Sequence, residues 1–132
     1  MVVDSSALIA IVFEEADAAE FDAVLAAEET ILLSAANWFE ACIRADNADD
    51  PNAGRTLDQI VALFDIAIMP VTADQAAIAR GAYRTCGRAN HPAALNFGDC
   101  FAYALAKSTS RPLLFKGEDF SKTDIIPARA MR

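Results

Sequence analysis

The feature that most constrains the fold is a regular alternation of short apolar segments with segments of helical periodicity. Strands are expected at 1–4, 30–33, 66–71, 112–115 and 124–126, and helices at 5–14, 17–28, 34–45, 55–64, 72–85 and 96–108. The turn-rich residues 46–54 are expected to form a loop. Because strands joined by helical crossovers run parallel and are covered by helices, this order is typical of an α/β domain. The sequence predicts a single domain over residues 1–132, with a central, mostly parallel, twisted sheet flanked by helices.

The composition limits the class of protein. Hydrophobic residues make up 55% of the chain and charged residues 23%, as in a globular domain. Cys42, Cys86 and Cys100 are isolated and odd in number, so we expect reduced thiols and neither a disulfide framework nor a zinc site. The longest apolar run, at 7–13, is too short for a membrane span, and the N-terminus lacks a signal peptide's basic start. We therefore expect a cytoplasmic protein that does not contact the membrane.

The charge balance bears on nucleic-acid binding. The formal net charge is -8 at pH 7. Indiscriminate binding of nucleic acids depends on Lys and Arg side chains that neutralise phosphates, so this charge argues against it. An RNA substrate would need a local basic rim or bound cations.

An acidic residue, Asp4, stands at the carboxyl end of the first predicted strand. In open parallel sheets the ligand-binding crevice lies outside the carboxyl ends of the strands, which places Asp4 at a candidate site. The alternative is structural, because Asp4, Ser5 or Ser6 can cap the helix at 5–14.

Two of the predicted helices carry a narrow polar stripe on an otherwise apolar surface. The stripes comprise Asn37, Glu40 and Arg44 on one helix and Asn96, Asp99, Tyr103 and Lys107 on the other. Such helices are expected to be largely buried, with each stripe facing something polar. Structural alternatives exist here too, since Glu40 can pair with Arg44 on the surface and Asp99 can reach back to the Asn96 cap.

Convergence of Asp4, Glu40 and Asp99 at the strand ends accounts for these features together. Carboxylates about 5 Å apart repel by roughly 3 kcal/mol at an effective dielectric of about 20, so such a site requires protons or a cation. Oxygen ligands without His or Cys suit Mg²⁺ or Mn²⁺, and the lone His91 lies in a predicted loop. Phosphodiester hydrolysis is the chemistry that such a metal supports.

Four stretches of the sequence together resemble a known family. They are MVVDSSALIAI at the start, SAANWFEA around Glu40, LNFGDCFAYALAK around Asp99, and PLLFKGEDFSKTDI near the end. In this order and spacing they resemble the PIN-domain ribonucleases, and within them the VapC toxins of bacterial toxin–antitoxin pairs. The likeness covers essentially the whole chain.

The resemblance implies a Mg²⁺-dependent endoribonuclease, with Mn²⁺ as the alternative ion. It assigns Asp4, Glu40 and Asp99 to the acidic cluster, with Asp4 and Asp99 as direct metal ligands. Glu40 would bind a second metal or orient the attacking water. Ser6 and Asn37 would support the site.

One position departs from the family pattern. Many members carry a fourth acid three residues before a Phe, and here Gly117 occupies that position. Asp119, directly before Phe120, is the nearest replacement, and the alternative is that it is an ordinary loop acid. Lys116, Arg84, Arg88 and His91 could together form a basic rim for RNA, and the alternative is that each is a solvated loop charge.

The resemblance also implies partners. They are a VapB-like antitoxin that blocks the cleft with a C-terminal segment often carrying Arg, a second toxin subunit in a homodimer, and an RNA substrate such as tRNA or rRNA. Two other classes of function stay open at this point. Gly117 raises the possibility of a catalytically silent PIN-fold binding module, and Lys116 after a late strand resembles the Lys of a receiver-type phospho-acceptor domain.

Overall fold

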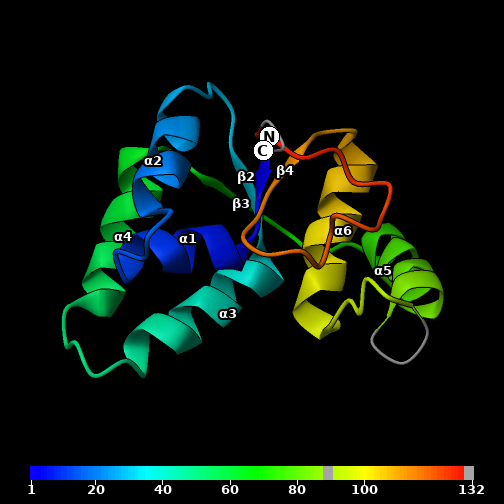
Figure 1. The fold of residues 1–132 in the computed structure, drawn as a ribbon, viewed down its shortest axis with the longest axis horizontal. Helices are drawn as coiled ribbons and strands as arrows, with labels where there is room; N and C mark the ends of the chain where they lie inside the picture. The colour runs from blue at the N-terminus through cyan, green and yellow to red at the C-terminus, as the bar shows by residue number, and fades with distance from the viewer. Residues whose placement is uncertain (88–90, 130–132) are drawn as a thin grey trace.

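The computed structural model describes residues 1–87 and 91–129. Short strands and longer helices alternate along the chain (Figure 1). In chain order the elements are β1 (Val2–Val3), α1 (Ser5–Val12), α2 (Ala18–Ala26), β2 (Leu32–Ser34), α3 (Ala35–Asp46), α4 (Ala53–Leu63), β3 (Ala67–Met69), α5 (Ala73–Cys86), α6 (Phe97–Thr109) and β4 (Leu113–Leu114).

The strands form a four-stranded sheet in the order β3-β2-β1-β4, and every pair of neighbours is parallel. Val2 of β1 aligns with Leu32 on one side and Leu113 on the other, so β1 is a central strand. β3 is an edge strand whose Ala67 and Ile68 are exposed. The predicted α/β architecture with a parallel sheet is confirmed.

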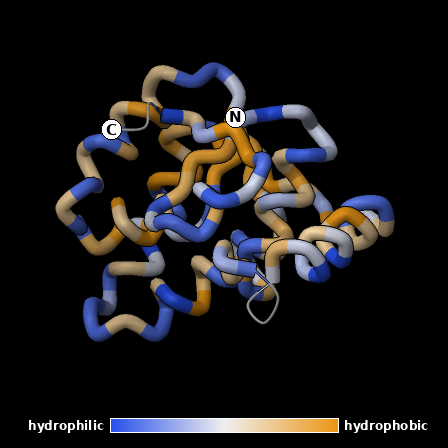
Figure 2. Tube along the Cα trace, turned by 45° about the vertical axis from the view of Figure 1, so that its right-hand side comes forward, coloured by the Kyte–Doolittle hydropathy of each residue, from blue (hydrophilic) through white to orange (hydrophobic). Residues whose placement is uncertain are grey.

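The side chains of the sheet alternate between two hydrophobic clusters, as the twofold period of a strand requires. Val3, Leu33 and Leu114 belong to the cluster formed with α1 to α4. Val2, Leu32 and Leu113 belong to the cluster formed with α5 and α6. Figure 1 shows these two groups of helices on opposite sides of the strands, and Figure 2 shows the apolar segments gathered between them. The chain is therefore a sheet enclosed between two helical layers, and a cavity lies at the carboxyl ends of β1 and β4.

Three sequence-based expectations about the elements were inaccurate. Residues 124–126 do not form a strand, because only a single bridge joins Leu113 to Pro127. The predicted loop at 46–54 is shorter, since α3 continues to Asp46 and α4 already begins at Ala53. The predicted strands at 1–4, 66–71 and 112–115 are reduced to the two or three residues of β1, β3 and β4.

The expectation that the striped helices are largely buried was wrong in part. On α3 only Asn37, Ala41 and Ala45 are buried, while Phe39 and Ile43 are exposed. The reason is that α3 packs on its neighbours through one face, which includes Ala41, Ala45 and the partly buried Trp38, while Phe39 and Ile43 point away from this face. Within residues 1–87 and 91–129, no helix combines the length and apolarity needed to cross a bilayer.

Candidate active site

Asp4 is held at the junction of β1 and α1. Its Oδ2 accepts hydrogen bonds from the Ser6 amide at 3.1 Å and from Ser6 Oγ at 2.5 Å, so Asp4 is the N-cap of α1. Ser6 Oγ in turn accepts a hydrogen bond from the amide of Lys116, which follows β4, at 3.0 Å. The capping interpretation is therefore correct, but it uses only one of the two carboxylate oxygens.

The second oxygen of Asp4 is buried without a partner. Asp4 is 3% exposed, and its Oδ1 has no hydrogen-bond partner among the described residues. Burial raises the pKa of Asp4 to about 6, although the hydrogen bonds from Ser6 oppose the rise. An ionised oxygen in this position is unfavourable unless a proton or a cation approaches it.

Glu40 projects from α3 toward α1 and α6. The carboxylate accepts hydrogen bonds from Ser5 Oγ and, at 3.4 Å, from Asn37 Nδ2. Asn37 is completely buried and also donates to the Gly98 carbonyl of α6 at 3.0 Å. Among the described residues the alternative, a surface ion pair with Arg44, does not form, because Glu40 faces these inward donors.

Gly98 determines how closely α6 approaches Glu40. A Cβ atom at Gly98 would lie 2.2 Å from Glu40 Oε2 and 2.9 Å from its Cδ. No other residue type leaves room for the carboxylate in its present position. The sequence offered a weak signal for this, a Gly directly before the third acid, which our sequence analysis missed.

Asp99 lies in the first turn of α6. Its Oδ2 accepts from the Asn96 amide at 3.0 Å and Asn96 Oδ1 accepts from the Asp99 amide at 2.8 Å, which is a complete capping box. Burial raises the pKa of Asp99 to about 7, and the nearby carboxylates of Asp4 and Asp119 add to the rise. The same carboxylate is thus both a cap and a member of a charged cluster.

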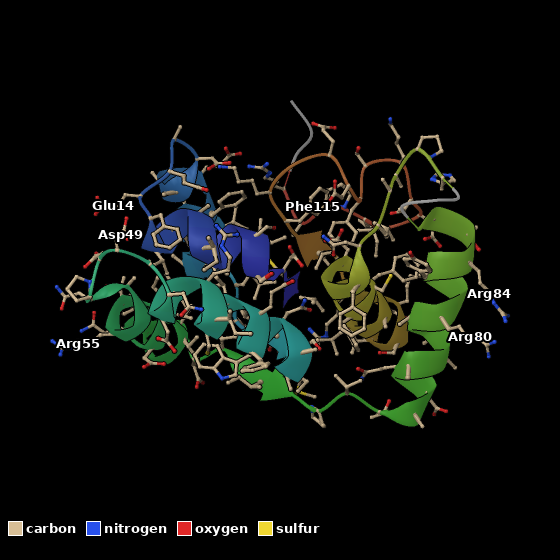
Figure 3. All side chains as sticks on the ribbon, turned by 90° about the horizontal axis from the view of Figure 1, so that it is seen from below. Glu14, Asp49, Arg55, Arg80, Arg84 and Phe115 are labelled. Atoms are coloured by element: carbon tan, nitrogen blue, oxygen red, sulfur yellow. The ribbon has the colours of Figure 1, made fainter. Side chains whose placement is uncertain are left out.

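Asp119 reaches the cluster from the loop after β4. The loop is anchored by Phe120, which is buried and packs on Phe115 with a ring-centroid distance of 5.1 Å. Figure 3 shows Phe115 between the two groups of helices. Asp119 itself is exposed. It lines the mouth of the same cavity as the other three acids.

The four acids line one cavity of about 210 Å³. Asp4, Glu40, Asp99 and Asp119 come from four separate segments, and Ser6 and Lys116 line the cavity beside them. Two further lining residues, Ser5 and Arg44, were not singled out as site residues by the sequence analysis. Their position in the cavity cannot be predicted from the sequence, because it depends on which helix packs against α1.

The expected basic rim is only partly assembled. Lys116 lines the cavity, but its Nζ lies 3.2 Å from carboxylate oxygens of both Glu15 and Asp17. The hydrogen bond to Glu15 is the largest cause that raises the pKa of Lys116. Arg84 is exposed on α5, away from the cavity (Figure 3). Arg88 lies outside the described residues.

The donor set fits a hard divalent cation. Asp4 Oδ1 is a buried anionic oxygen without a partner, and no His or Cys lines the cavity. Within the described ranges, no three acidic, His or Cys side chains already form a metal cage. Asp4, Glu40 and Asp99 each accept a hydrogen bond from a protein donor at one carboxylate oxygen. A cation held by a few carboxylates and several waters, as Mg²⁺ usually is, fits this arrangement.

Sequence comparison identifies the family. The sequence model of the PIN domain matches residues 1–126. The chain is 46% identical over 125 residues to VapC ribonuclease Mb0640 of Mycobacterium bovis, across 95% of each chain. It is 44% identical to ribonuclease VapC of Mycolicibacterium smegmatis, across 95% of this chain and 97% of that one. The chain therefore belongs to the PIN-domain family, within its VapC group.

Structural comparison agrees with the fold. The chain superposes on the crystal structure of Mycobacterium tuberculosis VapC20, a toxin described as cleaving the sarcin–ricin loop. The TM-score is 0.77 at 16% sequence identity, and 95% of each chain is covered. The receiver-type alternative raised by Lys116 was therefore wrong, because the whole domain is a PIN domain.

The buried acids predict an unusual dependence of stability on pH. The pKa of Asp4 rises from 3.8 to about 6 on folding, so the folded state binds this proton more tightly than the unfolded state. The free energy of unfolding of the metal-free protein therefore falls as pH rises from about 4 to about 6. Asp99 extends the fall to about pH 7. For Asp4 the loss is about 3 kcal/mol.

Melting temperatures measured in EDTA between about pH 4.5 and about pH 8 test this sign. Asp4→Asn should melt higher than the parent at the upper end and show a flatter profile. Asp124→Asn is the matched control, because Asp124 pairs with Lys107 outside the cavity and hydrogen bonding to Lys107 lowers its pKa. A parent profile that rises toward high pH would contradict the prediction.

Proposed function

We propose that this protein is a divalent-metal-dependent endoribonuclease that acts as the toxin of a VapBC-like toxin–antitoxin pair. The observation that carries the proposal is the convergence of four carboxylates, from four segments of the chain, on one cavity with a partnerless buried oxygen. The relatives of the chain are named VapC ribonucleases, which supports the activity and the toxin role.

Each acid has a distinct place in the proposed mechanism. Asp4 and Asp99 are the most buried of the four, and they would hold Mg²⁺ or Mn²⁺. The bound ion would supply activation of water and neutralisation of charge at the phosphate. Glu40, fixed by Ser5 and Asn37, would orient the attacking water or hold a second ion. Asp119, exposed at the mouth, would complete the acidic set.

Gly117 does not favour a catalytically silent module. Its φ is +92°, in the left-handed region where side chains other than glycine are strained. An acid at this position would therefore distort the loop, whereas Asp119 lines the cavity without such strain. We infer that Asp119 takes the place of the usual fourth acid. Binding of a cation without catalysis is the outcome that would favour the silent module.

The partners follow from the same site. A cavity lined by four acids suits a basic segment, and we propose that a VapB-like antitoxin inserts an Arg there. We propose that the substrate is a structured RNA, tRNA or rRNA, and that the protein acts in the cytoplasm. The exposed Phe39 and Ile43 of α3 support a homodimer, because apolar side chains of this size gain stability when covered.

Nuclease activity is tested with purified, antitoxin-free protein and total cellular RNA. We expect cleavage in Mg²⁺ or Mn²⁺ and none in EDTA. Asp4→Asn and Asp99→Asn should each lose more than about a hundredfold, because loss of even an outer partner of a metal ligand costs about 10–100-fold. Asp124→Asn serves as the control, since its carboxylate pairs with Lys107 elsewhere.

Unchanged cleavage in EDTA would disprove the metal requirement. Full activity in Asp4→Asn would disprove the assignment of the site. Melting curves with and without Mg²⁺ distinguish a catalytically silent module from a protein that binds no metal. An ion that binds only the folded state raises the free energy of unfolding, and the melting temperature with it, as its occupancy rises. A Mg²⁺-dependent shift without cleavage would favour the silent module.

Gly98→Ala tests the positioning of Glu40. The added methyl group would collide with the end of a flexible side chain, so Glu40 should swing away while the fold is kept. We expect activity to fall about 10–100-fold, with little further loss when Glu40→Gln is added. Gly81→Ala is the matched control, because nothing lies within 4 Å of its added Cβ. Additive losses in the double variant would contradict the proposed contact.

The homodimer is tested by light scattering after gel filtration. We expect the mass of two chains for the parent and of one chain for Phe39→Glu or Ile43→Glu, because a charge at an apolar interface must be desolvated. Leu63→Glu, at an even more exposed position on α4, should leave the mass unchanged. A parent that elutes with the mass of one chain would refute the dimer.

A further inference from the structure

A second hollow adjoins the acidic cavity. A groove of about 690 Å³ lies between α5 and α6, and Glu40 and Asn96 line both the groove and the cavity. Ala76 and Ala79 of α5 give it a floor of small side chains. The groove is therefore continuous with the proposed reaction site, and a polymer chain lying across the acids would pass along it.

Aromatic rings line this groove from two helices. Phe97 and Phe101 of α6 lie edge to face, with ring centroids 4.9 Å apart and an interplanar angle of 82°. Phe97 is 79% exposed, and Tyr83 of α5 is 43% exposed on the same groove. Phe97 directly follows the Asn96 cap and precedes Asp99 by two residues. The helix thus fixes an open ring face close to the acids.

The groove also offers positive charge in an acidic protein. Arg80 lines it, and Arg84 follows one turn later on α5 (Figure 3). Within the described residues neither forms an ion pair, whereas Lys107, Lys116 and Arg129 are each paired with carboxylates. Arg80 is therefore available to a phosphate that follows a base in the groove.

We propose that this groove binds an unstacked base of the RNA strand, on the ring of Phe97, beside the phosphate held at the acidic cavity. The inference rests on the proposed ribonuclease function and adds a base-binding subsite to it. A chain with a net charge of -8 gains little from neutralising phosphates, so more of its affinity must come from contacts with bases. Aromatic rings supply such contacts for every base, since each base has a face to stack.

A second copy of the chain is the competing occupant. A second copy is expected to cover the exposed apolar residues of α3, but Phe39 and Ile43 do not line the groove. A protein partner seated between α5 and α6 would also close the path that leads to Glu40. The continuity of the groove with the acids therefore favours a nucleotide.

The test compares two fluorescent probes of equal length, an oligoadenylate and its abasic ribose-phosphate counterpart. Binding is measured by anisotropy in Mg²⁺, with intact probe verified on a gel. We expect the parent to prefer oligoadenylate. Phe97→Ala should weaken oligoadenylate binding about five- to hundredfold and leave abasic binding unchanged. Phe97→Leu should resemble Phe97→Ala, and Leu63→Ala, at a similarly exposed position, should resemble the parent.

Equal or unmeasurable affinity of the parent for the two probes would overturn the inference, as would equal weakening of both by Phe97→Ala. The groove would instead be assigned to a second copy of the chain by a combination of two results. Phe97→Ala would have the mass of one chain, while Phe97→Leu would keep the mass of two chains and the base preference of the parent. These outcomes are distinct from failure of the proposed function. If the parent cleaves RNA in Mg²⁺ but shows no base preference, only the subsite is disproved.

Discussion

The buried carboxylate of Asp4 is the constraint on which the rest of the site depends. It stands at the end of β1, the strand that pairs with both β2 and β4, and its Oδ1 has no partner among the described residues. A parallel sheet brings the carboxyl ends of its strands to one edge, so other acids meet Asp4 there. Burial raises the pKa of Asp4 and Asp99, and the repulsion between the neighbouring carboxylates adds to the rise. The fold therefore stores an unfavourable charge arrangement that a cation would relieve.

The same polar groups begin the helices and build the site. Asp4 caps α1, and Asn96 with Asp99 forms the capping box of α6. A helix start supplies amides that hold a carboxylate in a fixed direction, and in Asp4 the second oxygen has no partner among the described residues. The structural and functional interpretations of these acids are thus compatible. Ser34 differs, because it begins α3 without a side-chain cap and its buried Oγ has no partner among the described residues.

Two glycines show how backbone geometry limits the acidic set. Gly98 allows α6 to approach Glu40, and Gly117 provides the left-handed turn after β4. Asp119 follows this turn, and its loop is anchored by the contact between Phe115 and Phe120. Under the proposed assignment Asp119 takes the place of the usual fourth acid, and it lines the cavity from this loop.

Sequence patterns alone predicted the α/β class, the order of the six helices and of the four strands that form, and the approach of Asp4, Glu40 and Asp99 to one cavity. They could do so because hydrophobic periodicity and helix caps are local properties. They did not determine how α3 is oriented, so the hydrogen bond from Ser5 to Glu40 and the exposure of Phe39 were not foreseen. Nor did they show that Gly98 makes room for a carboxylate, or that Phe97 faces a groove beside it. Only the tertiary structure decided these features, because they depend on contacts between helices far apart in the chain.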